Sequence, residues 1–299
     1  MFLSGLFIPV FLLFLQTSQP SYRQEIENWR QEREARLKSE GGWLTVVGLF
    51  WLKEGRNTVG ADAGSDIALP QNSAPASVGQ FIFEKGEVRF EAAPGVAAMV
   101  NGKPAGSARM KPDTSGAPDV LRINSLTMFA IQRGRRMGIR LKDTNSPARM
   151  TFAGLKHFPI RENYRVKARY EPYDPPKKLS IPNVLGESSE DLSPGYVEFV
   201  LDGKRCRLEP LLEGEELFFI FKDKTAARET YPAGRYLYAA TPKRGEVILD
   251  FNKAINPPCA FTPYATCPLP PRQNHLAVRI EAGELRYGHA GEKPRNKNR

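Results

Sequence analysis

The chain has 299 residues, of which 41% are hydrophobic and 10% aromatic, and its formal net charge is +10. This composition is typical of a globular protein and excludes a disordered chain, and the length favours two domains. The positive charge lies in two local clusters without an aromatic stacking pattern beside the arginines, so no nucleic-acid partner is expected.

Residues 1–20 contain an apolar run from Leu6 to Leu15 that is broken only by Pro9. The run is too short for a comfortable membrane span and matches the hydrophobic region of a secretory signal, although no Lys or Arg precedes it. We therefore expect a signal peptide, or an anchor if it stays uncleaved, and an extracytoplasmic (periplasmic or secreted) protein. Contact with a membrane is expected only through this leader.

Residues 21–40 are charged and rich in helix formers. Four positions recur at spacings of three or four residues: Ile26, Trp29, Arg33 and Leu37. This pattern predicts a helix that lays one narrow apolar stripe against a sheet. Its Glu and Arg side chains are expected to be solvated, and Gly41-Gly42 is expected to end it.

From residue 41 onwards, short β-prone runs alternate with turn residues such as Asn101-Gly102. Their spacing predicts a β-sandwich over residues 41–157. A second series of β-prone runs predicts another β domain over residues 158–288, and the boundary is placed near Phe158. The polar segment 289–299 carries four basic residues and is expected to be a disordered tail.

The predicted fold class is therefore all-β, with two sandwich-like or barrel-like domains after an N-terminal helix. Four prolines are expected to mark the connection between the two domains: Pro159, Pro172, Pro175 and Pro176.

Residues 55–60 (GRNTVG), followed by Asp62 and by residues 65–70 (SDIALP), resemble the pattern of forkhead-associated (FHA) domains. The resemblance implies an FHA-like sandwich over about residues 43–143. In that family an Arg after the glycine and a downstream Ser and His hold phosphothreonine. In this chain Ala61 stands at the position of that Arg, and residues 74–81 contain no histidine. The charge-assisted donors that a phosphate needs are therefore missing. We expect the phosphothreonine function to be lost.

Residues 250–274 hold two of the three cysteines and six prolines among polar side chains. Proline fixes φ and lacks an N–H group, so this segment cannot be an ordinary helix or a central strand. Long irregular connections in compact domains are often functional, which makes this segment the place to expect a site.

This segment, together with residues 48–52, 138–143 and 229–236, resembles a bacterial and archaeal family catalogued as domain of unknown function 1684. The resemblance extends from Trp29 to Glu284 and implies no activity.

Cys259 and Cys267 allow several interpretations. A disulfide that staples the loop is the leading one, because export would favour it. A metal site with His275 fits poorly, because the first two ligands of structural zinc are usually two to four residues apart. A nucleophilic thiol, or two buried thiols, are the remaining alternatives, and we expect no metal and no cofactor.

Polar and aromatic residues of the second domain are predicted to line one pocket: Arg235, Tyr236, Asp250, Asn252, Lys253, Asn256 and Tyr264. The leading functional hypothesis is an exported binding protein for a small polar molecule. One alternative is a hydrolase-like enzyme that uses Asp250 with Lys253 or Arg235. Another is an envelope interaction module without a pocket. Arg235 could also form only a structural ion pair with Asp250 or Glu229.

Overall fold

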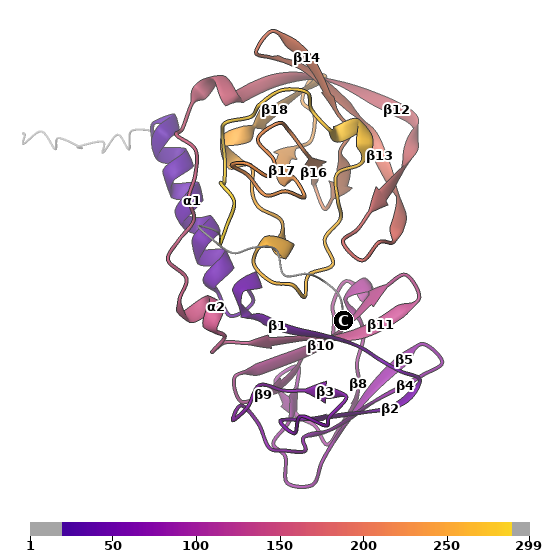
Figure 1. Ribbon diagram of the computed structural model, residues 1–299. Coiled ribbons are helices and arrows are strands. Elements are labelled where there is room, and N and C mark those ends of the chain that lie inside the picture. The colour runs from indigo at the N-terminus through magenta and orange to yellow at the C-terminus, as the bar shows by residue number, and fades with distance from the viewer. Residues whose placement is uncertain (1–19, 289–299) are drawn as a thin grey trace, which may run out of the picture.

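Two β domains and one helix make up the computed structural model, which describes residues 20–288 (Figure 1). The leader expected in residues 1–20, apart from Pro20, and the tail expected in residues 289–299 lie outside the described part. Among residues 20–288, no helix is long and apolar enough to cross a membrane.

The first domain is a sandwich of two largely antiparallel sheets. The six-stranded sheet has the order β1 (Val46–Trp51), β11 (Arg136–Asp143), β10 (Leu126–Arg133), β9 (Leu121–Ile123), β6 (Met99–Val100) and β7 (Lys103–Pro104). The five-stranded sheet has the order β3 (Ile67–Ala68), β2 (Gly55–Gly60), β4 (Gly79–Glu84), β5 (Glu87–Ala92) and β8 (Ser107–Arg109). Alternate residues of both sheets fill the core between them. Phe81 and Phe90, which are partners on the adjacent strands β4 and β5, contribute two rings with centroids 5.3 Å apart. The sandwich expected from the FHA resemblance is therefore present.

The second domain consists of two sheets that wrap around one core. The four-stranded sheet has the order β14 (Lys204–Leu208), β13 (Ser188–Leu201), β12 (Arg165–Pro182) and β18 (Glu246–Asp250). The three-stranded sheet has the order β15 (Leu211–Glu213), β16 (Glu216–Phe221) and β17 (Arg235–Ala240). The sheets approach each other where β13 meets β15 and where β17 meets β18, which gives the barrel-like form in Figure 1.

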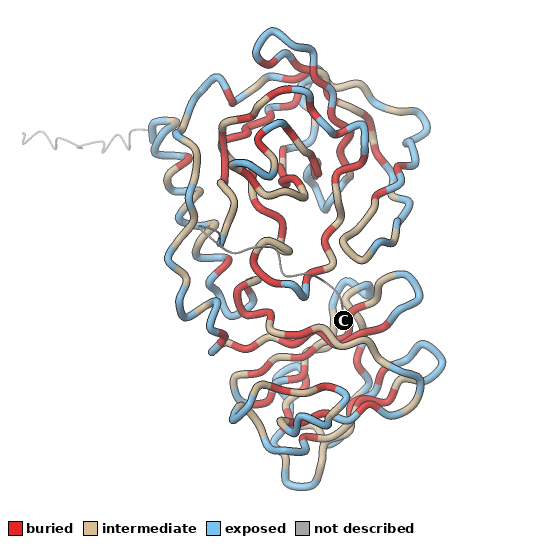
Figure 2. The backbone as a smooth tube through the Cα atoms, viewed as in Figure 1, coloured by how far each residue is buried: buried red, intermediate tan, exposed pale blue. Residues whose placement is uncertain are grey.

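Short helices connect these elements: η1 (Trp43–Thr45), η2 (Asp113–Ser115), α2 (Pro147–Met150), η3 (Glu162–Tyr164), η4 (Phe251–Lys253), η5 (Pro258–Ala260) and η6 (Arg272–Asn274). Three of them lie in the proline-rich segment 250–274, which is irregular as expected. Figure 2 shows that much of this segment is buried. Buried asparagines replace the missing sheet hydrogen bonds; Asn274 Nδ2, for example, donates to the carbonyl oxygens of Glu209 and Ile220 at 2.9 and 3.0 Å.

Helix α1 (Tyr22–Lys38) packs against the second domain, although the sandwich follows it in sequence (Figure 1). Ser21 caps it through a hydrogen bond from Gln24 N to Ser21 Oγ, and Ile26 and Leu37 are buried as predicted. The chain turns away at Gly42, where a Cβ atom would lie 2.1 Å from the carbonyl oxygen of Leu37. Only glycine allows this close approach.

One expectation about the strands is wrong. Pro172, Pro175 and Pro176 lie inside the long strand β12 instead of marking the passage between the domains. The strand accepts them because its register with β13 shifts between Pro172 and Lys177, where ladder hydrogen bonds are absent. Residues 276–280 form no strand, although Leu276, Val278 and Ile280 are buried.

Candidate functional site

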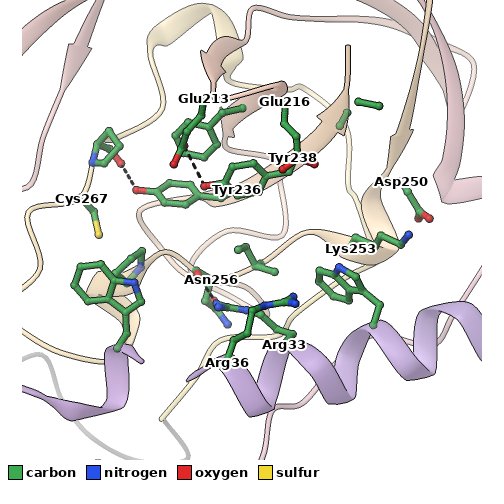
Figure 3. A pocket seen from close by; sticks show the side chains of 18 of the residues that line it. Arg33, Arg36, Glu213, Glu216, Tyr236, Tyr238, Asp250, Lys253, Asn256 and Cys267 are labelled. Atoms are coloured by element: carbon green, nitrogen blue, oxygen red, sulfur yellow. Dashed lines mark hydrogen bonds between the residues drawn. The ribbon is translucent and has the colours of Figure 1, made fainter. Parts of the chain in front are cut away.

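A cavity of about 1010 Å³ lies between α1 and the three-stranded sheet of the second domain (Figure 3). Helix α1 and η1 form one wall, and β15, β16 and β17 form the wall opposite. Part of the proline-rich segment, Arg165 of β12, Ile248 of β18, and Arg133 at the end of β10 in the sandwich complete the lining. Pockets of this kind, between elements of different domains, are common places for ligands.

Aromatic side chains cover much of both walls: Trp29, Trp43, Phe218, Tyr236 and Tyr238. Phe218 stacks on Tyr238 with ring centroids 4.8 Å apart and meets Tyr236 edge-on at 4.9 Å. The Tyr236 hydroxyl donates to the carbonyl oxygen of Pro268 at 2.9 Å, and the Tyr238 hydroxyl donates to Glu213 Oε2 at 3.2 Å. Burial is the main cause that raises the pKa of both phenols, so both rings stay neutral.

Four of the nine charged lining residues occupy facing walls. Arg33 and Arg36 rise from α1, whereas Glu213 and Glu216 descend from the sheet, with the tyrosine rings between them (Figure 3). Arg33 Nε also forms a 3.0 Å ion pair with Glu284 Oε1, and the Glu284 side chain is fully buried. Burial is the main cause that raises the pKa of Glu284, and Arg33 opposes this shift.

A polar cluster borders the cavity where β18 ends. Asp250 Oδ1 accepts hydrogen bonds from the Tyr22 hydroxyl at 2.9 Å and from the Asn252 backbone N at 3.1 Å. Lys253 Nζ forms a 2.6 Å ion pair with Glu25 Oε1, and this contact holds the pKa of Glu25 below its usual range. These pairs join α1 to the second domain at the rim of the cavity.

Asn256 borders the cavity with its side chain fully buried. Its Nδ2 atom donates to the carbonyl oxygen of Leu285 at 2.8 Å, but its Oδ1 atom has no hydrogen-bond donor within the described part of the chain. A buried amide oxygen without a donor is unfavourable, but this atom has almost no accessible surface and offers no contact to the cavity.

Four of the predicted pocket residues therefore line the cavity, namely Tyr236, Asp250, Lys253 and Asn256. Arg235 does not, because it precedes Tyr236 on β17 and side chains alternate between the faces of a strand. Arg235 lies in the core, where it pairs with Asp223 at 3.2 Å and donates to the carbonyl oxygens of Ile280 and Ala282. Its role is structural, with Asp223 as the partner instead of Asp250 or Glu229.

The other two predicted residues also lie off the cavity. Strand β18 ends at Asp250, so Asn252 sits in η4, fully buried, and donates to Asp250 Oδ1, to the Tyr22 hydroxyl and to the carbonyl oxygen of Arg161. It holds the cavity rim in place. Tyr264 is 38% exposed on the surface of the proline-rich segment.

The cysteines differ from the leading expectation, because all three are thiols and no disulfide joins Cys259 to Cys267. The two residues do lie in contact, since Cys259 N donates to Cys267 Sγ at 3.1 Å. The hydrogen bond with the Cys259 side chain and burial raise the pKa of the Cys267 thiol, which disfavours the thiolate that nucleophilic catalysis needs. His275 contacts the carbonyl oxygen of Pro270, and residues 20–288 contain no group of His, Cys, Asp or Glu that could hold a metal ion.

Sequence reasoning missed the helix side of the cavity, which includes Trp29, Arg33 and Arg36. The signal was available, because Trp29 and Arg33 belong to the recurring stripe that predicted burial. The basic run before residue 143 does not lie wholly in solvent. Arg140 is instead buried against the ring of Trp43, 5.1 Å from its centroid, and burial is the main cause that lowers its pKa to about 10.

The fold and the cavity define a two-domain all-β protein in which an N-terminal helix closes a ligand-sized cavity on the second domain. Residues 150–285 match the model of a family described as "Protein of unknown function (DUF1684)". The chain belongs to this family, which confirms the resemblance seen in the sequence. The match contains the sheet wall of the cavity but not α1.

Two solved structures are similar to parts of the chain. The solution NMR structure of an uncharacterized protein from Haloarcula marismortui shares 32% identity, covers 46% of this chain and 78% of that one, and has a TM-score of 0.39. The FhaA FHA domain, crystallised in complex with the intracellular domain of a partner protein, shares 14% identity, covers 31% of this chain and 97% of that one, and has a TM-score of 0.23. No curated protein matches the chain.

Proposed function

We propose that this protein binds a small polar molecule in the cavity between α1 and the second domain. The observation that carries the proposal is the cavity itself, a volume of about 1010 Å³ lined by aromatic rings and by charges of both signs. Ligand sites are typically apolar clefts of about 300–1,000 Å³ with a few convergent polar groups, and this cavity stands at the upper end of that range.

The tyrosine hydroxyls support the same proposal. Their hydrogen bonds to Pro268 and Glu213 hold the aromatic wall in a fixed arrangement before any ligand enters.

No observation favours the hydrolase-like alternative over binding. Asp250 Oδ1 already accepts hydrogen bonds from Tyr22 and Asn252, and Lys253 is paired with Glu25. Arg235 is buried elsewhere. The groups that the enzyme hypothesis needed are thus engaged in holding the helix and the rim.

The proposal also includes export, for which the apolar run in residues 1–20 is the support. N-terminal sequencing of the protein isolated from its native cell envelope would test it. A retained Met1 on protein recovered only from the cytoplasm would contradict export without touching the cavity.

Ligand binding can be tested by titrating a panel of polar metabolites while following intrinsic fluorescence. Trp29 and Trp43, two of the three tryptophans, line the cavity, so an occupant should change the emission. Ala240→Trp fills the cavity from its exposed edge and should weaken binding at least about tenfold, which corresponds to about 1.4 kcal/mol. The matched control is Ala153→Trp, at an exposed site away from the cavity.

Binding that Ala240→Trp leaves unchanged would place the ligand elsewhere. A panel from which no molecule binds would refute the proposal.

A further inference from the structure

Charges of opposite sign face each other across the cavity without touching. The arginine pair, Arg33 and Arg36, projects from α1, and the glutamate pair, Glu213 and Glu216, projects from the opposite sheet (Figure 3). Within residues 20–288, no ion pair or hydrogen bond joins one pair to the other. In this part of the cavity a basic pair therefore faces an acidic pair, with aromatic rings between them.

One member of each pair is already engaged. Arg33 pairs with the buried Glu284 and also donates to the carbonyl oxygen of Asn256 at 3.3 Å. Glu213 accepts the hydrogen bond of the Tyr238 hydroxyl.

The other members of the two pairs, Arg36 and Glu216, have few polar contacts within the described residues. The carboxylate nearest Arg36 is that of Glu32, 3.6 Å away and 68% exposed, on the same face of the helix surface. Exposed pairs of this kind contribute little. The Glu216 side chain makes no hydrogen bond or ion pair with any described residue. Within these two pairs, Arg36 and Glu216 are thus the charges that are still available to an occupant.

A molecule with one kind of charge meets a penalty in such a cavity. An anion that contacts Arg36 also feels the field of Glu213 and Glu216, and a cation that contacts Glu216 also feels the two arginines. Attraction and repulsion of this kind act together in setting specificity. A molecule that carries both charges, one at each end, gains from both walls and is repelled by neither.

We propose that the occupant is a zwitterion of about dipeptide size, with its cationic and anionic ends apart and at least one flat ring between them. The inference rests on the proposed binding function and names its ligand class. The carboxylate or phosphate end would meet Arg36, and the ammonium end would meet Glu216. The rings of Trp29, Trp43 and Phe218 would contact the body of the molecule.

The size of the cavity agrees with this class. A volume of about 1010 Å³ exceeds what one free amino acid fills, and aromatic walls favour stacking over contact with an aliphatic chain.

The test uses four forms of one molecule, so that only charge differs. Phenylalanyl-phenylalanine is titrated into the full-length protein by isothermal calorimetry with both ends free, with the amine acetylated, with the carboxylate amidated, and with both ends blocked. We expect the free dipeptide to bind at least tenfold more tightly than either singly blocked form. The doubly blocked form, which keeps the rings, reports the contribution of the aromatic walls.

Two variants assign the ends of the molecule. Glu216→Gln should abolish the preference for the free over the acetylated dipeptide and keep the preference over the amidated one. Arg36→Gln should do the reverse. The matched controls are Glu215→Gln and Arg23→Gln, two exposed charges that do not line the cavity, and both should leave every preference unchanged.

Each other outcome overturns a defined part of the reasoning. If all four dipeptide forms bind with equal affinity and Ala240→Trp abolishes their binding, the zwitterion hypothesis is refuted but the cavity remains the binding site. The zwitterion hypothesis is also refuted if no dipeptide form binds while another polar molecule binds to the wild type but not to Ala240→Trp. If no molecule of any kind binds, both the ligand class and the proposed function fail.

Discussion

Replacing Arg33 with leucine would break the ion pair that joins α1 to the second domain. The Glu284 side chain is fully buried and that of Arg33 is 12% exposed, and their Nε–Oε1 distance is 3.0 Å. Removing one partner of a buried pair leaves an uncompensated charge and costs about 3–5 kcal/mol. The free energy of unfolding of Arg33→Leu should fall by that amount at neutral pH.

Urea denaturation followed by tryptophan fluorescence measures this change, with the slope of the transition checked for constancy. Arg23→Leu is the matched control, because Arg23 lies on the same helix with 67% of its side chain exposed and pairs only weakly with Glu27 at 4.0 Å. Its cost should stay within about 0.5 kcal/mol. Adding Glu284→Gln to Arg33→Leu should recover part of the loss, because the stranded charge is gone.

The pH dependence provides an independent check. Burial raises the pKa of Glu284 above its usual 4.5, and loss of Arg33 removes a group that lowers it. Below the unfolded-state value the carboxyl is protonated in both states, so the penalty for a stranded charge disappears there. The difference between wild type and Arg33→Leu should therefore shrink as the pH falls towards 4.5. A cost for Arg33→Leu no larger than that of Arg23→Leu, at every pH, would show that this pair does not hold the helix.

Three further predictions concern other buried groups. Arg235→Leu leaves the buried Asp223 carboxylate without its partner and should lower the free energy of unfolding by about 3–5 kcal/mol in urea denaturation. Unchanged stability together with lost ligand binding would instead indicate that Arg235 contacts the ligand. Mild oxidation should join Cys259 to Cys267, which already touch, and intact mass should then fall by two hydrogens; an unchanged mass would contradict it. Burial lowers the pKa of His157 from 6.5 to about 4. Between these values the imidazole is protonated in the unfolded state and neutral in the folded state, so the free energy of unfolding should decline as the pH falls through that interval. His157→Phe should flatten this part of the stability curve, and an unaltered curve would exclude His157 as its cause.

Much of the fold could be predicted because strands leave a local pattern in the sequence. Alternating burial along β5 and β14, for example, follows directly from alternating side chains. The error at Pro172 had a different origin, since proline interrupts a strand only where the partner strand needs its N–H group. The shifted register between β12 and β13 removes that need, and no local pattern reveals which residues a partner strand will face.

The site was predictable only on one wall. Asp250, Lys253 and Asn256, which the sequence singled out, line the cavity. The helix wall depends on contacts between residues more than two hundred positions apart, such as Arg33 with Glu284. The misplacement of Arg235 was avoidable, however. Arg235 and Tyr236 are adjacent on a strand, so both could not point into the same cavity, and alternation alone excludes one of them.

The placement of α1 also has a consequence for how the protein is made. The helix leaves the ribosome before the whole sandwich, but its docking partners are synthesised at different times. Leu44 follows the helix closely, Leu155 and Phe158 come in the middle of the chain, and Asp250 and Glu284 come near its end. The residues that form the sheet wall of the cavity are synthesised long after the helix wall, so the cavity cannot form until most of the chain has been made.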